Sequence, residues 1–129
     1  MQQRIAQITI VVKDYDEAIE FYTRKLHFTL LEDTVMSETK RWVVVAPPGS
    51  TACTLLLAKA ANEAQTAAVG NQTGGRVGFF LYTDNVLRDY QDMVAKGVAV
   101  LQEPTKAPYG TVVVFADLYG NRWDLIEPI

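Results

Sequence analysis

Apolar residues along the chain recur with two different periods, and these periods follow each other in the same order twice. Continuous apolar runs lie at residues 8–12 and 77–81, and they are rich in the branched and aromatic side chains that favour strands. After each run, apolar residues are spaced three and four positions apart, over residues 18–26 and 86–94, which predicts an amphipathic helix. The pattern therefore predicts a strand followed by a helix at two places in the chain.

Three further strand-like runs follow each predicted helix. Turn residues separate the last two runs of each set, at 47–50 and at 117–121, which predicts a hairpin in both places. The six runs are residues 28–31, 42–46 and 52–58 in the first half and residues 98–101, 111–116 and 122–126 in the second. Each half is thus predicted to be a β-α-β-β-β unit.

The two halves are an internal repeat. Residues 14–32 match residues 84–102 at a constant offset of 70, which is the signature of two copies of one structural unit. Asp14 and Asp84 (or Thr83) stand where a side-chain oxygen caps the start of each helix. The second helix is expected to end at Gly97, because glycine readily takes the left-handed conformation there.

We predict one α+β domain over residues 1–129. It would consist of unit one (residues 1–61), a polar, glycine-rich linker (residues 62–74) and unit two (residues 75–129). Each unit would form a curved mixed sheet with an apolar concave face, and two sheets together would enclose a concave cleft. Such a cleft is the default position for a small-molecule ligand.

Composition narrows the range of functions. The formal net charge is −3 with only 12 Lys and Arg residues, so nucleic acid is not an expected partner. No apolar run approaches the length of a membrane span, and the first residues lack the apolar core of a signal peptide. We therefore expect no membrane partner and a cytoplasmic location. The single Cys53 lies in an apolar run, where a buried, unreactive thiol is expected.

Two phrases of the sequence resemble the vicinal oxygen chelate superfamily, which includes glyoxalases, bleomycin resistance proteins and extradiol dioxygenases. One phrase is residues 10–14 (IVVKD) leading into residues 18–22 (AIEFY), and the other is the closing stretch at residues 117–127 (DLYGNRWDLIE). The resemblance implies a fold that serves isomerases, dioxygenases, epimerases, thiol transferases and proteins that only bind ligands, so it does not fix an activity.

Enzymes of this superfamily generally hold a divalent metal with one ligand from each opening strand and one from each closing strand. The resemblance maps these positions onto Gln7, Val77 and Asp124, while residues 51–61 contain no carboxylate. Gln7 and Asp124 alone are too few to hold a divalent metal. We expect no cofactor and no metal, and we name Gln7 and Asp124 as the ligands if a metal does bind. His27 is expected to be solvated and structural.

Gln7 and four other residues are candidates for substrate binding, and Asp124 is the candidate catalytic residue if the protein is an enzyme. Strand alternation requires that Arg41 or Trp42 face the concave side, where the first would attract an anion and the second would stack on a planar ligand. The alternative is a solvated Lys-Arg pair with Trp42 in the core. Tyr109 and Trp123 are similar aromatic candidates.

Two functions from different classes remain open. The first is a protein that binds a small molecule in the cleft without a complete metal site, in a groove lined by aromatic side chains. The second is a lyase, isomerase or dioxygenase that is either metal-dependent or uses Asp124 as a general base. In both cases a homodimer is expected, because members of the superfamily commonly pair or exchange their units between chains.

Overall fold

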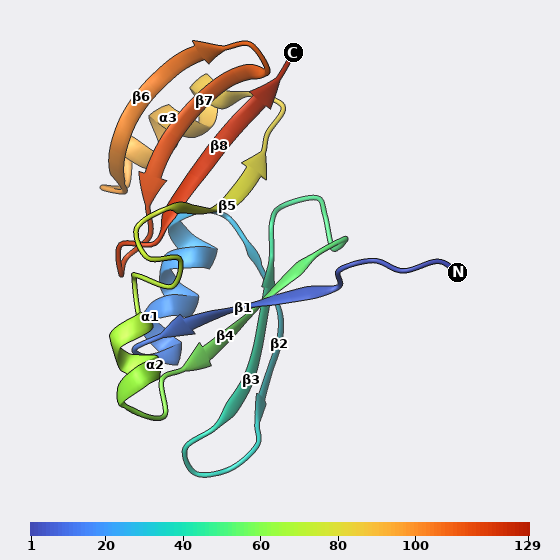
Figure 1. The fold of residues 1–129 in the computed structure, drawn as a ribbon, viewed down its shortest axis with the longest axis vertical. Helices are drawn as coiled ribbons and strands as arrows, with labels where there is room; N and C mark the ends of the chain where they lie inside the picture. Colours follow the sequence, from blue (N-terminus) through green and yellow to red (C-terminus); the bar gives the residue numbers. More distant parts are fainter. The chain divides into compact units, whose positions relative to one another are not determined.

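The first unit is a four-stranded mixed sheet that carries a helix on one face (Figure 1). In the computed structural model, which describes residues 1–129, this unit comprises Met1–Val69. Its strands are β1 (Gln7–Val12), β2 (Thr29–Val35), β3 (Arg41–Ala46) and β4 (Thr54–Lys59), in the spatial order β1-β4-β3-β2. Strand β1 runs parallel to β4, whereas β3 is antiparallel to both of its neighbours.

Helix α1 (Tyr15–Glu20) packs on β3 and β4 and continues as a π-helical turn, η1 (Phe21–Lys25). The Asp14 carboxylate caps the helix by accepting a hydrogen bond from the Glu17 N–H at 2.9 Å, as the sequence predicts. Alternate side chains of the strands meet this helix in a buried apolar core. Its members include Ile10, Val12, Ala18, Tyr22, Val43, Val45, Leu55 and Leu57.

The second unit, Gly70–Ile129, repeats this arrangement. Its strands are β5 (Val77–Tyr82), β6 (Ala99–Ala107), β7 (Gly110–Ala116) and β8 (Arg122–Pro128), in the order β5-β8-β7-β6, and its main helix is α3 (Val86–Ala95). Strand β5 is again parallel to the closing strand, β8. The two sheets and their order confirm the predicted α+β fold of two tandem β-α-β-β-β units.

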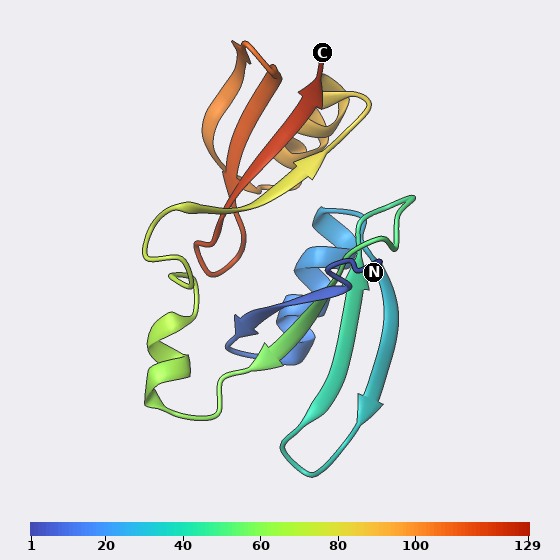
Figure 2. The same cartoon turned by 45° about the vertical axis from the view of Figure 1, so that its right-hand side comes forward.

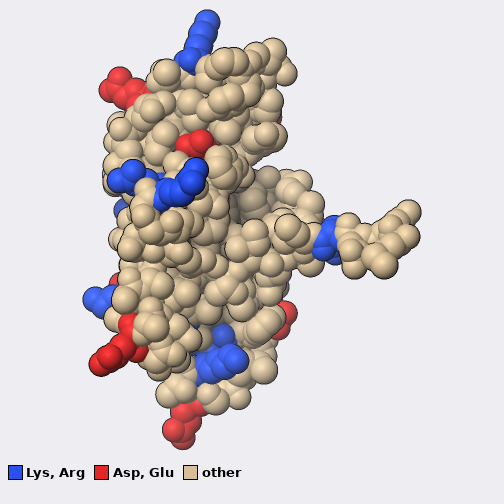
Figure 3. Space-filling view, viewed as in Figure 1, with Lys and Arg blue, Asp and Glu red and all other residues tan.

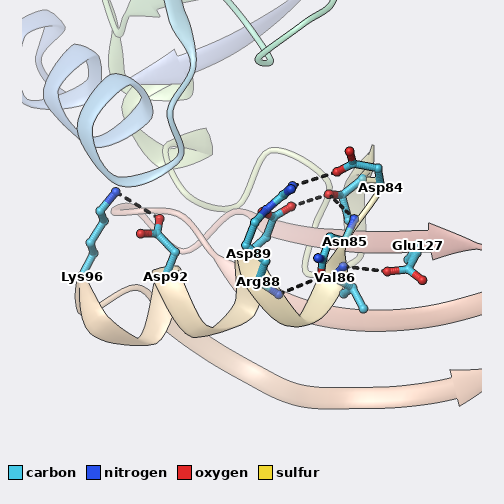
Figure 4. A network of polar contacts seen from close by, with 9 residues as sticks. Asp84, Asn85, Val86, Arg88, Asp89, Asp92, Lys96 and Glu127 are labelled. Carbon is cyan, nitrogen blue, oxygen red and sulfur yellow. Dashed lines mark hydrogen bonds and ion pairs between the residues drawn. The ribbon is translucent and has the colours of Figure 1, made fainter.

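Polar contacts hold the start of α3 to the end of its sheet (Figure 4). Glu127 of β8 accepts a hydrogen bond from the Val86 N–H at 2.9 Å, and the Asn85 side chain caps the helix by accepting from the Arg88 N–H at 3.0 Å. The prediction from sequence that Asp84 or Thr83 caps this helix is therefore wrong by one or two positions. Asp84 pairs with the Arg88 guanidinium instead, at 2.8 Å.

Both main helices end in a left-handed residue. The φ angle is 62° at His27 and 76° at Gly97. Gly97 therefore ends the second helix as expected, while His27 takes the corresponding place in the first unit. The His27 side chain is exposed, in agreement with the solvated position predicted for it.

The stretch predicted as a linker contains a third helix, α2 (Glu63–Ala68), which follows β4 along the chain and is drawn in light green in Figure 2. Asn62 caps it by accepting from the Gln65 N–H at 2.9 Å, and the Gln65 side chain accepts in return from the Ala61 N–H at 2.7 Å. This reciprocal arrangement is a variant of the capping box. The polar segment thus satisfies its own backbone groups locally.

None of the helices is both long enough and apolar enough to cross a membrane. On the face of the molecule drawn in Figure 3, Lys and Arg side chains are scattered among Asp and Glu side chains. No single charged patch dominates that face.

Candidate functional site

The first unit contains a cavity of about 710 Å³ at the ends of β3 and β4. The turn between β2 and β3 and the start of α2 complete its wall. Its apolar part includes Trp42, Leu56 and Ala58, and its polar part includes Lys40 and Lys59. A volume of this order is typical of small-molecule sites.

Trp42 points away from α1. Its neighbour Val43 is fully buried on the helix side, opposite Leu57 of β4, and successive side chains of a strand point to opposite faces. Trp42 therefore shares the other face with Leu56, and it remains half-buried. An indole in this position offers a ring face to a ligand and one N–H donor.

Arg41 lies on the opposite face, against the helix. Its guanidinium contacts Asp33 at 2.7 Å and Asp16 at 2.9 Å, and it lies 5.1 Å from the centre of the Tyr15 ring. The hydrogen bonds from Arg41 lower the pKa of the Asp33 carboxyl, while the bonds to Asp33 and Asp16 raise the pKa of Arg41. Two carboxylates thus hold the single positive charge of Arg41, and the pair with Asp16 of α1 shows that Arg41, rather than Trp42, faces the helix.

Asp124 lies on the sheet face of the second unit that is opposite to α3. Glu127 and Trp123 point to the helix side, and strand alternation sends Asp124 to the other, where Phe80 and Val114 are its cross-strand neighbours. Burial raises the pKa of the Asp124 carboxyl. A partly desolvated carboxylate of this kind can accept a proton or bind a polar ligand group.

Gln7 is the first residue of β1, and its side-chain oxygen accepts a hydrogen bond from the Thr54 hydroxyl at 3.1 Å. Val77 holds the equivalent place at the start of β5 and offers no ligand atom. Strand β4 presents no carboxylate on the face that Gln7 shares, since its residues there are Thr54, Leu56 and Ala58. These donors do not fit a divalent metal, and no three His, Cys, Asp or Glu side chains cluster as ligands.

The two remaining aromatic candidates are in different surroundings. Trp123 is only 3% exposed, and its ring stacks on Phe79 at 4.8 Å and on Phe115 at 5.8 Å between centroids. Tyr109 lies in the turn between β6 and β7 and is 56% exposed. The indole of Trp123 is therefore packed into the core of the second unit, whereas the Tyr109 ring is open to solvent.

The structure therefore divides the six candidates between the units. Gln7, Arg41 and Trp42 belong to the first, and Tyr109, Trp123 and Asp124 belong to the second. Sequence reasoning missed Lys59 and Gln65, which also line the cavity beside Trp42. The spacing of Asn62 and Gln65 is a helix-start signal that could have placed Gln65.

The closing phrase of the sequence has a structural role. The Asp117 carboxylate accepts hydrogen bonds from the Tyr119 and Asn121 N–H groups, both at 2.9 Å, and from the Asn121 amide at 2.8 Å. Asp117 and Asn121 are both buried, and Gly120 has a φ angle of 102°. These residues fix the turn between β7 and β8. Of the two other acidic residues in residues 117–127, Glu127 contacts α3 and Asp124 faces away from it.

Comparisons with known proteins agree with this fold. The sequence profile of the Glyoxalase/Bleomycin resistance protein/Dioxygenase superfamily matches residues 4–125. An uncharacterized protein of Shewanella frigidimarina is 54% identical over 128 residues, which cover 98% of this chain and 95% of that protein. The uncharacterized protein YurT of Bacillus subtilis is 32% identical over 129 residues, covering 96% and 98% of the two chains.

Solved structures are similar over the full length. The crystal structure of UcmS2 has a TM-score of 0.86 at 32% identity, with 98% of this chain and 99% of that chain covered. TnmS3, an antibiotic binding protein from Streptomyces sp. CB03234, has a TM-score of 0.80 at 29% identity, with 99% and 98% covered.

Proposed function

The chain belongs to the glyoxalase/bleomycin resistance protein/dioxygenase superfamily, and from this we propose that it binds a small aromatic molecule without a metal ion. The observation that carries the proposal is the position of Trp42. Its indole lines a cavity of about 710 Å³ together with Leu56 and Ala58, whose side chains share its face of the sheet. Apolar and aromatic walls with a few polar groups are typical of small-molecule sites.

The similarity to TnmS3 supports a ligand of antibiotic type. That protein is an antibiotic binding protein, and it is 29% identical to this chain over nearly its whole length. A planar antibiotic would stack on Trp42, and this stacking would be favourable because it buries the contacting faces of the two rings.

The residues at the metal-ligand positions of the superfamily support binding that does not depend on a metal. Val77 stands where Gln7 stands in the other unit, and Asp124 is the one carboxylate at a ligand position of the superfamily. Binding would then rest on ring contacts and hydrogen bonds alone.

Isothermal titration calorimetry against a panel of planar antibiotics tests the proposal. We expect at least one member to bind the wild type, and Trp42→Ala to weaken that binding at least about tenfold, which corresponds to about 1.4 kcal/mol. The matched control is Tyr109→Ala, which removes an exposed aromatic ring from the second unit. Equal binding by the wild type and Trp42→Ala would refute the proposal.

Asp124 favours a second candidate function, that of a lyase or isomerase using acid–base chemistry. Burial raises the pKa of its carboxyl, and a raised pKa improves a carboxylate as a general base near neutral pH. If a turnover is found, Asp124→Asn should abolish it while leaving ligand affinity within about threefold. Turnover that survives this substitution would eliminate Asp124 as the base.

We also propose that the protein is a homodimer. Phe80 and Tyr82 of β5 are 63% and 71% exposed, and exposed aromatic side chains on one strand are a common feature of self-association surfaces. Light scattering at micromolar concentration should give twice the chain mass of 14.4 kDa. A mass equal to one chain would contradict the dimer.

A further inference from the structure

Two of the three cations that line the cavity of the first unit have no acidic partner. Lys40 and Lys59 make no ion pair, whereas Arg41 is held between Asp16 and Asp33. Both lysine side chains are exposed, so each ammonium group is free to turn towards a ligand.

The lining contains no Asp or Glu residue, although the chain as a whole carries a net charge of −3. The positive charge of the cavity therefore runs against the overall charge of the protein. Asp16 and Asp33 contact the Arg41 guanidinium, so Lys40 and Lys59 carry the positive charge that is left for a ligand.

Several side chains of the wall offer hydrogen-bond donors to a ligand. The Gln65 side-chain oxygen is occupied by the Ala61 N–H at 2.7 Å, so only the amide N–H groups of Gln65 are left for a ligand. Lysine ammonium groups and the Trp42 indole can only donate. These donors are complementary to a ligand group that accepts hydrogen bonds and carries negative charge.

We propose that this cavity selects aromatic ligands that carry an anionic group, such as a carboxylate, sulfonate or phosphate. The anionic group would lie between Lys40 and Lys59, and the ring system would lie against Trp42. This inference rests on the proposed binding function and adds the charge of the ligand to it.

A matched pair of fluorescent probes tests the inference. Anilinonaphthalene sulfonate carries an anionic group, and phenylnaphthylamine has the same ring skeleton without it. We expect the wild type to bind the sulfonate about tenfold more tightly than the neutral probe, and added salt to reduce this difference.

Charge-removing substitutions locate the effect. The double variant Lys40→Met, Lys59→Met keeps the aliphatic part of both side chains and removes both charges. Because exposed charge pairs contribute modestly, its affinity for the sulfonate should fall by about fivefold or more. Its affinity for phenylnaphthylamine should not change. The control Lys106→Met removes an exposed lysine from β6 of the second unit and should leave the affinity for both probes unchanged.

The outcomes separate the two proposals. Equal binding of both probes, lost in Trp42→Ala, would overturn the anion preference and leave the aromatic binding function standing. If neither probe binds, or if Trp42→Ala binds both probes as tightly as the wild type, both proposals are overturned. A loss of sulfonate affinity in Lys106→Met as large as in the double variant would also overturn the assignment to Lys40 and Lys59.

Discussion

Arg41 and Trp42 are consecutive residues of β3, and their side chains leave the strand on opposite faces of the sheet. The Arg41 guanidinium is fixed between two carboxylates at 2.7 and 2.9 Å, while the Trp42 indole lines the cavity. Both residues line the cavity, but the Arg41 guanidinium is held by carboxylates, whereas the Trp42 ring is available to stack on a ligand. The alternation of a strand is sufficient to produce this division of roles.

The two tryptophans should differ sharply in their effect on stability. Trp123→Ala removes a buried ring stacked on two others, and it should lower the free energy of unfolding by roughly 3–5 kcal/mol. Trp42→Ala removes a half-buried ring from a cavity wall, and it should cost about 1 kcal/mol. Urea denaturation followed by circular dichroism measures both. Similar losses in the two variants would show that Trp42 is a core residue.

The pH dependence of stability should reveal the burial of Asp124. Its pKa is raised in the folded state, so the ionised form is disfavoured on folding and stability is lost as the pH rises from the ordinary value of about 3.9 through the folded pKa. Asp124→Asn removes this cost. We expect the variant to be more stable than the wild type at neutral pH, with the advantage disappearing near pH 3.

Asp33 provides a control of opposite sign. The hydrogen bonds from Arg41 lower its pKa, so Asp33 stabilises the fold above the ordinary carboxyl pKa, and this contribution is lost as the pH falls through the folded pKa. Asp33→Asn should therefore be less stable than the wild type at neutral pH, and the difference should shrink in acid. Parallel pH profiles for the two variants would contradict both assignments.

The hydrogen bond between Glu127 and Val86 predicts a long-range effect on α3. Glu127→Ala leaves the Val86 N–H without its partner, and it should lower the free energy of unfolding by roughly 1–3 kcal/mol. Hydrogen exchange should show faster exchange at the first turn of α3. Glu103→Ala, at an exposed position of β6, is the matched control and should change neither measurement. Unchanged protection of Val86 in Glu127→Ala would contradict this role.

Much of the fold could be predicted from local sequence patterns. Strands β3, β7 and β8 begin within one residue of the predicted runs, because their apolar side chains are packed on a helix and bounded by turn residues. Strand β6 extends to Ala107, well beyond the predicted end at residue 101, because its second half is specified by pairing with β7. Pairing between strands is a long-range property that a single run does not encode.

The candidate site was less predictable than the fold. Alternation shows that Arg41 and Trp42 face opposite ways, but it does not say which of them meets the helix. The ion pairs with Asp16 and Asp33 settle this, and one of them joins residues far apart in the sequence. Trp123 was an equally reasonable candidate until its contacts with Phe79 and Phe115 were known.

Divalent metals should have little effect on stability. A ligand that binds only the folded state raises the melting temperature, and the positions of Gln7 and Val77 do not provide a set of metal ligands. We expect Zn²⁺, Mn²⁺ and Ni²⁺ at modest excess to leave the melting temperature within about 1 °C of its starting value. A larger increase that is absent in Gln7→Ala would contradict this account.

Tryptophan fluorescence tests the central claim most directly, because the chain has only two tryptophans. In the variant Trp123→Phe, all tryptophan emission comes from Trp42 in the cavity wall. Titration with a planar anionic aromatic ligand, such as anilinonaphthalene sulfonate, should then quench this emission saturably, with the same midpoint as the rise in probe fluorescence. Saturable probe binding with unchanged Trp42 emission would show that the ligand binds elsewhere and would contradict the account.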